Sequence, residues 1–296
     1  MNIWKERFPD KLFNVIAVII LIILAVITFY PFYYLIVYSL NDPIDAMRGG
    51  IYLWPRIFSI DAYKVVWTTN NIGRAAFISL ARTVIGTALM VFFTSMLAYV
   101  LSHTDLIARK FFNLLFVTTM YIGAGTIPWY LTLRAYGATN SFWVYVIPGM
   151  VGVWNMILVR VYMQEIAPEM RESAEVDGAN DFIIFIRIVL PVCVPVLAVI
   201  GIFGAVGQWN SWFDAAVFNS SSPNLQPLQE ILMNMLKKAS IRSSSDVQLG
   251  GAASLKLTPE AMRAAVTIIA TVPIIVVYPF FQKYFAQGIM LGSVKG

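Results

Sequence analysis

The segment Pro168–Pro191 holds the most specific pattern of residue types in this 296-residue sequence. Pro168 suits the first turn of a helix, where its missing N–H costs no hydrogen bond, and Glu169 and Glu172 lie near the same helix end, where negative charge is favoured. Gly178 is placed to end this short helix in a left-handed conformation. An amphipathic stretch follows. The segment therefore predicts two short helices joined at a glycine and packed against a helix bundle. Such a geometry can transmit a displacement of the segment to the helices of the bundle.

A second group of side chains suggests contact with a polar solute. The group combines amides and indoles and consists of Gln208, Trp209, Asn210 and Trp212. Aromatic faces cover the apolar faces of sugar rings, and amides bond hydroxyl groups. The same types also form aromatic belts and interhelical hydrogen bonds in membranes. Two interpretations stay open, the lining of a sugar pathway and an interface belt.

The composition indicates what surrounds these residues. Hydrophobic residues make up 59% of the chain and charged residues 12%, against roughly 45–50% and about 25% in a soluble domain. Because so few charged residues cannot cover a globular surface in water, we expect lipid to surround much of the protein.

Six long runs without charge predict six transmembrane helices in one domain, residues 1–296. A span needs about 20 apolar residues, and backbone groups in lipid must bond within their own segment, which makes the expected fold all-α. The expected spans are residues 12–40, 75–102, 111–132, 141–163, 190–213 and 263–283. An even number places both termini on one side. The first run is too long for a secretion signal and reads as a retained span.

At residues 172–191 the sequence resembles the permease subunits of ABC importers. Their cytoplasmic loop has the pattern Glu-Ala-Ala, three residues, Gly, nine residues, Ile-x-Leu-Pro. Here Glu172-Ser173-Ala174 precedes Gly178 with that spacing, and Ile188-Val189-Leu190-Pro191 follows nine residues later. Ser173 replaces the first Ala, a change of one small residue for another.

The resemblance implies a type I importer permease fold with a coupling helix between spans four and five. In the family this helix docks into a cleft of the ATPase subunit. Carried onto this chain, the contact falls on Arg171, Glu172, Ala174, Asp177, Gly178 and Ala179. The resemblance also places both termini and this loop in the cytoplasm of a bacterial cell, in agreement with the denser positive charge of the shorter loops on that side.

Further stretches resemble the carbohydrate group, and more closely its members for complex oligosaccharides. They include residues 208–213 and the ending Gly288–Gly296. The resemblance implies a larger second permease, a dimer of ATPase subunits that binds ATP and Mg, and an extracytoplasmic solute-binding protein. In the family the C-terminal tail, here about residues 284–296, reaches between the ATPases, and the loop 219–258 can reach into the binding protein.

Single residues inside or beside the spans leave smaller questions. Arg82, at depth in the second span, either marks function or extends its charge to the interface. Asp214 is expected in water at the end of span five, and His103 is expected to be solvated rather than a ligand. Gly123 and Gly125, with Pro128 nearby, suggest close packing or a bend in span three.

The sequence lacks the residue patterns that several kinds of enzymatic or binding activity require. The sequence has no Gly-x4-Gly-Lys-Ser/Thr phosphate loop, no metal-ligand cluster, no nucleophile with a paired base and no patch for nucleic acid. We therefore expect a transport subunit that is not itself an enzyme and holds no cofactor. A self-sufficient carrier or channel is the alternative, although the spans almost lack the ionisable groups that couple ions. A membrane scaffold or sensor is a third interpretation.

Overall fold

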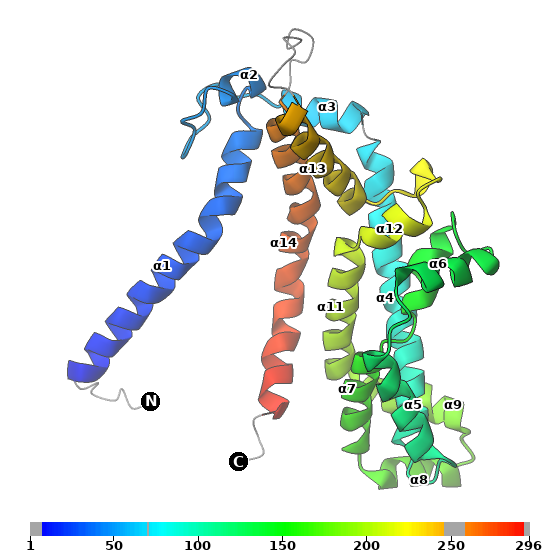
Figure 1. Ribbon diagram of the computed structural model, residues 1–296. Coiled ribbons are helices and arrows are strands. Elements are labelled where there is room, and N and C mark those ends of the chain that lie inside the picture. Colours follow the sequence, from blue (N-terminus) through cyan, green and yellow to red (C-terminus); the bar gives the residue numbers. More distant parts are fainter. Residues whose placement is uncertain (1–7, 70, 246–257, 293–296) are drawn as a thin grey trace. The chain divides into compact units, whose positions relative to one another are not determined.

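The computed structural model describes residues 8–69, 71–245 and 258–292, and these parts of the chain are helical, without a strand (Figure 1). This confirms the all-α expectation. The backbone forms two compact units, one of Met1–Asn70 with Met235–Ile269, the other of Asn71–Asn234 with Ala270–Gly296. The prediction of a single domain is not tested by this division.

The first unit contains α1 (Phe8–Ser39), α2 (Pro43–Ala46) and α3 (Asp61–Thr69). The 28 residues Leu12–Ser39 of α1 are apolar enough to cross a membrane. Their side chains are mostly exposed, as expected of a helix whose solvent is lipid. A short α2 begins where Asp42 accepts hydrogen bonds from the backbone N–H groups of Ile44 and Asp45.

The second unit is built around α4 (Ile72–Ser102), α7 (Val153–Gln164) and α11 (Val194–Asn210), which pack side by side. Glycines permit the close approach of α4 and α11. A Cβ on Gly86 would meet the side chain of Gln208 at 2.8 Å, and one on Gly204 would collide with Met90. The buried core of this bundle includes Met156, whose side chain is fully enclosed.

Three expected spans are bent rather than straight. Span three consists of α5 (Arg109–Tyr121) and α6 (Thr126–Ala135), which meet at 116°. The break contains Gly125, with φ of +81°, so the predicted bend is confirmed and its cause is a backbone conformation that glycine adopts freely.

The other two bent spans have different breaks. Residues 142–149, which form η1 (Phe142–Tyr145) and η2 (Ile147–Gly149), meet α7 at 44°. The helical stretch 181–192 meets α11 at 84° near Pro191, a residue that disfavours a continuous helix. That stretch comprises α9 (Asp181–Ile184), η3 (Phe185–Val189) and α10 (Leu190–Val192).

The remaining helices are α8 (Pro168–Val176), α12 (Phe213–Phe218), η4 (Pro223–Leu225), α13 (Leu228–Ser245) and α14 (Pro259–Gly292). Within the described chain, three single helices have the length and composition of membrane spans, and three bent helix pairs pass the same test. The count reaches six only if each bent pair crosses the membrane once. The six-span count stays a prediction. The C-terminal tail and the loop 219–258 were expected to contact the ATPases and the binding protein. Parts of both segments, residues 293–296 and 246–257, lie outside the described part of the chain.

Candidate functional sites

The predicted segment 168–191 folds locally as its residue types dictate. Pro168 opens α8, and Glu169 lies in its first turn. Gly178 has φ of +82°, and the N–H of Ala179 donates to the carbonyl of Ala174 at 3.0 Å, which closes the helix end. The helix-glycine-helix prediction is confirmed.

The six residues assigned to coupling divide into outward and inward members. Glu172, Asp177 and Gly178 are exposed, whereas Ala174 is buried and Ala179 half-buried against the core. Arg171 donates to Glu175 at 2.6 Å. Burial alone would lower the pKa of Arg171, but the bond to Glu175 and its charge raise it, so the guanidinium stays charged. α8 therefore presents a charged face outward and anchors its opposite face in the bundle.

The chain after Gly178 fastens this segment to three long helices. Asn180 accepts a hydrogen bond from the N–H of Ile183 at 2.9 Å and begins α9. Phe185 is 1% exposed and its ring lies 5.3 Å from that of Tyr99 on α4. The same core contains buried residues of α7 and α11. A displacement of α8 would consequently act on α4, α7 and α11 together.

A polar cavity of about 570 Å³ lies beside α8, between the end of α4 and the start of α5. His103 lines it, with Nδ1 at 2.7 Å from the carbonyl of Tyr99 and its ring edge-on to that of Tyr99 at 4.6 Å. Its side chain is 15% exposed. Ring packing and the backbone bond cover much of His103, and the expectation that it is solvated rather than a ligand stays a prediction. No metal-binding group of acidic, histidine or cysteine side chains occurs within the described residues.

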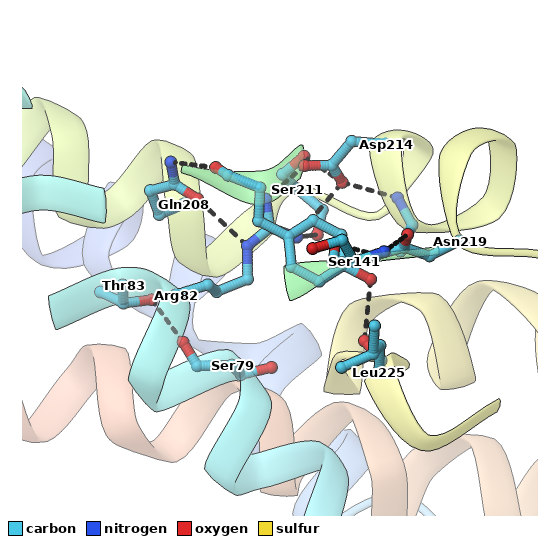
Figure 2. Close-up of polar contacts among 11 residues, drawn as sticks. Ser79, Arg82, Thr83, Ser141, Gln208, Ser211, Asp214, Asn219 and Leu225 are labelled. Atoms are coloured by element: carbon cyan, nitrogen blue, oxygen red, sulfur yellow. Dashed lines mark hydrogen bonds and ion pairs between the residues drawn. The ribbon is translucent and has the colours of Figure 1, made fainter. Parts of the chain in front are cut away.

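The second site lies where α4 passes the junction of α11 and α12. Gln208 accepts from Arg82 Nε at 3.1 Å, and its amide donates to the carbonyl of Tyr145 at 3.0 Å. Arg82 also pairs with both carboxylate oxygens of Asp214 and lies 4.3 Å from the centre of the Tyr145 ring. Figure 2 shows Arg82, Gln208 and Asp214 converging from α4, α11 and α12.

Two expectations about this charge pair need correction. Asp214 is only partly exposed, at 21% of its side chain, because the Arg82 guanidinium, the Ser211 hydroxyl and the N–H of Ala215 bind its carboxylate. Arg82 does not extend toward an interface either, since its side chain is 1% exposed. In the sequence, only the position of Arg82 deep inside an expected membrane span indicated that the residue matters. Its partner could not be read from the sequence, because 131 residues intervene.

The four predicted pathway residues separate in space. Gln208 lines a cavity, whereas Trp209, on another face of α11, is buried and donates from Nε1 to the carbonyl of Ala270 at 2.9 Å. Asn210 accepts from Gln229. Trp212 packs edge-on against Phe213. Of the four, the structure places only Gln208 in the cavity wall.

The cavity holds about 460 Å³, within the range of small-molecule sites. Its wall carries charged, amide and aromatic groups, among them Arg82, Asp214, Asn155, Trp129 and Tyr145. Five glycines form part of the rest: Gly86 of α4, Gly149 of η2, Gly152 just before α7, and Gly204 and Gly207 of α11. Trp129, Tyr145 and Asn155 were not predicted. Each lies in a helical element that adjoins one of the bends, and no local pattern distinguishes it.

Known proteins resemble the chain over nearly its whole length, although no family model matches it. It is 35% identical over 288 residues, 97% of this chain and 99% of the other, to the polygalacturonan/rhamnogalacturonan transport system permease protein YtcP of Bacillus subtilis (strain 168). It is 26% identical, over 92% of this chain and 93% of the other, to the arabinooligosaccharides transport system permease protein AraQ of Halalkalibacterium halodurans. A crystal structure of a bacterial ABC transporter that imports the acidic polysaccharide alginate has a chain similar to it, with a TM-score of 0.82, 26% identity and coverage of 95% and 99%.

Proposed function

Because this chain belongs to the permease subunits of ABC sugar importers, we propose that it carries an oligosaccharide into the cytoplasm by alternating access. It does so in the plasma membrane of a bacterium, with both termini cytoplasmic. A larger second permease, two ATPase subunits and an extracytoplasmic solute-binding protein complete the transporter. ATP and Mg bind in the ATPase subunits. The oligosaccharide class is supported by the names of the relatives, which refer to polysaccharide fragments and arabinooligosaccharides.

The attachment of α8 to the bundle carries this proposal. The exposed charged face of α8 offers a contact for an ATPase subunit, and Val176, 88% exposed, adds an apolar one. Ala174 and Phe185 join the segment to the core shared by α4, α7 and α11. Closure of the ATPase dimer would push α8, and the rigid core would pass that push to the helices that line the 460 Å³ cavity.

The same cavity is the proposed contact site for the sugar in this chain. Trp129 offers an aromatic face, and Asn155 and Gln208 offer amides for hydroxyl groups. The charge of Arg82 is neutralised by Asp214, so the wall is polar without net charge from this pair. Bent spans suit such a site, since irregular backbone at membrane depth is tolerated where it lines a cavity.

A substitution that fills the cavity tests this assignment. Gly207 lines the cavity, and a Cβ added there would meet nothing within 4 Å. Gly207→Leu should therefore fold, fill the cavity and reduce ATP-driven uptake of a radiolabelled oligosaccharide at least about tenfold, whereas Gly207→Ala should remain within about twofold of wild type. The assay uses the complete transporter in vesicles, with surface level measured in parallel.

Two outcomes separate the parts of the proposal. Wild-type uptake in Gly207→Leu would remove the cavity from the pathway while the importer function stood. Uptake by the chain alone, without ATP or an ATPase, would support the alternative, a self-sufficient carrier, and overturn the importer function. Purification from native membranes, followed by mass spectrometry, identifies the subunits that accompany the chain.

A further inference from the structure

The loop between α2 and α3, here called the aromatic loop (residues 51–58), is tied at its end to the end of α1. The N–H of Asp42 donates to the carbonyl of Ile57 at 2.8 Å, and the N–H of Ser59 donates to the carbonyl of Leu40 at 2.9 Å. Asn41 and Phe58 form an antiparallel bridge. The loop therefore returns to the point where α1 ends.

Polar groups order this loop from within. The Asp45 side chain is 8% exposed and accepts from Asn41 Nδ2 at 3.0 Å and from Arg56 Nε at 3.0 Å. Arg56 also donates to the carbonyl of Gly49 at 2.8 Å. These bonds hold both sides of the loop together, and Ile51 at its start is buried with Val37 and Ala46, so the aromatic loop has a defined shape.

Apart from Ile51, which is buried, the large apolar side chains of the loop are exposed. Trp54 is 77% exposed, Phe58 69%, Tyr52 63% and Leu53 59%. Single exposed apolar residues are ordinary, but adjacent ones on an ordered loop mark a surface that is covered in use.

The depth of the loop indicates what covers it. The Tyr33 hydroxyl of α1 donates to the carbonyl of Leu53 at 2.7 Å, so the loop turns back alongside α1 (Figure 1). The 28 residues of Leu12–Ser39 extend about 42 Å at 1.5 Å per residue, close to the full bilayer with its headgroups. Tyr33 lies six residues, or about 9 Å, before the end of α1. With Leu12–Ser39 spanning the bilayer, Leu53 would lie level with the boundary between headgroups and hydrocarbon.

We infer that the aromatic loop is an interfacial anchor, with Tyr52, Leu53 and Trp54 inserted into the bilayer surface in the leaflet where α1 ends. Tryptophan and tyrosine favour this layer because their rings are apolar and their N–H and O–H groups bond headgroups. Tyr30 and Tyr34 of α1 lie in the same region of the helix.

The anchor would fix the tilt and depth of α1 relative to the membrane. A helix whose apolar length exceeds the hydrocarbon thickness can tilt or shift, and interfacial aromatic residues limit that freedom. The inference requires only that α1 crosses the membrane, and it is independent of the sugar and of the coupling through α8.

The test measures the depth of residue 54 directly. Trp54→Cys and Arg48→Cys are made separately in a Cys193→Ala background, since Cys193 is the only cysteine. Each variant is labelled with a bimane fluorophore in the transporter purified with its accompanying subunits. The labelled protein is placed in phosphatidylcholine vesicles that contain doxyl-labelled phosphatidylcholine, and iodide serves as the aqueous quencher. Wild-type uptake activity shows that each labelled variant is folded.

We expect lipid-borne doxyl to quench the label at position 54 at least about twofold more strongly than the label at position 48, and iodide to show the reverse order. Equal iodide access at both positions would overturn the inference. Shielding of position 54 that appears only when a solute-binding protein is docked would also overturn it and identify the loop as a protein-docking surface.

Discussion

Arg82 of α4 and Asp214 of α12 form an ion pair across 132 positions of the sequence, with the guanidinium almost fully enclosed. The pair connects the two helical elements that flank one end of the cavity. Arg82 is further held by Gln208 and by the carbonyl of Ser211. Arg82, Asp214, Gln208 and Ser211 thus form a polar network beside the cavity in which the two charges balance (Figure 2).

Removing one partner of this pair should destabilise the protein strongly. Asp214→Ala leaves a buried guanidinium without its counter-charge, and we expect a loss of about 3–5 kcal/mol. The measurement is thermal unfolding in detergent. Arg74→Ala is the matched control, because Arg74 lies on the same helix and makes an exposed bond to the carbonyl of Asn224. Equal melting temperatures for the two variants would show that the pair contributes little.

Two substitutions at Gly178 separate backbone strain from side-chain volume. A Cβ there meets nothing within 4 Å, but φ is +82°, a conformation that β-branched residues avoid and asparagine tolerates. Gly178→Val should reduce transport-coupled ATP hydrolysis at least about tenfold by distorting the end of α8, at a cost of about 1–3 kcal/mol. Gly178→Asn should remain near wild type, and membrane insertion should be normal in both. Full coupling in the Val variant would contradict the role of α8.

Gln208 and Trp209 are neighbours in sequence but should differ in effect. Gln208→Met removes an amide from the cavity wall and should raise KM for uptake. Trp209→Phe loses the bond to the carbonyl of Ala270 and part of a buried ring, and should lower stability by at least about 1 kcal/mol while KM is unchanged. Uptake kinetics and thermal unfolding of both variants distinguish these effects. A similar rise of KM in both would indicate that the pathway is not confined to the Gln208 face.

Asp45 should make the first unit sensitive to acid. The hydrogen bond from Asn41 chiefly, with the bond and charge of Arg56, lowers the pKa of Asp45. A carboxylate with a lowered folded pKa stabilises above its unfolded value of about 3.9, and that contribution is lost as pH falls through the folded value. The melting temperature of wild type should therefore exceed that of Asp45→Asn at pH 6, and the difference should shrink below about pH 4. A constant difference across this range would argue against the role of ionised Asp45.

Local residue chemistry by itself determines a large share of this protein. Charge-free runs predict helices because backbone groups in lipid have no other partners, and α1, α4 and α14 contain the expected runs. Pro168 and Gly178 delimit α8 because each imposes a backbone preference at its own position. Such effects act within a few residues, so a single sequence is enough to reveal them.

Tertiary structure alone decided which side chains meet. Arg82 of α4 meets Asp214 because α4 packs against α11, which leads into α12. Trp129 and Tyr145 lie in the cavity wall on elements that adjoin the bends of 116° and 44°. Helical periodicity cannot reveal such angles when nearly every face of a span is apolar. For the same reason the sequence does not distinguish the neighbours Gln208 and Trp209, whereas the packing of α11 gives one a place in the cavity wall and the other a place in the protein interior.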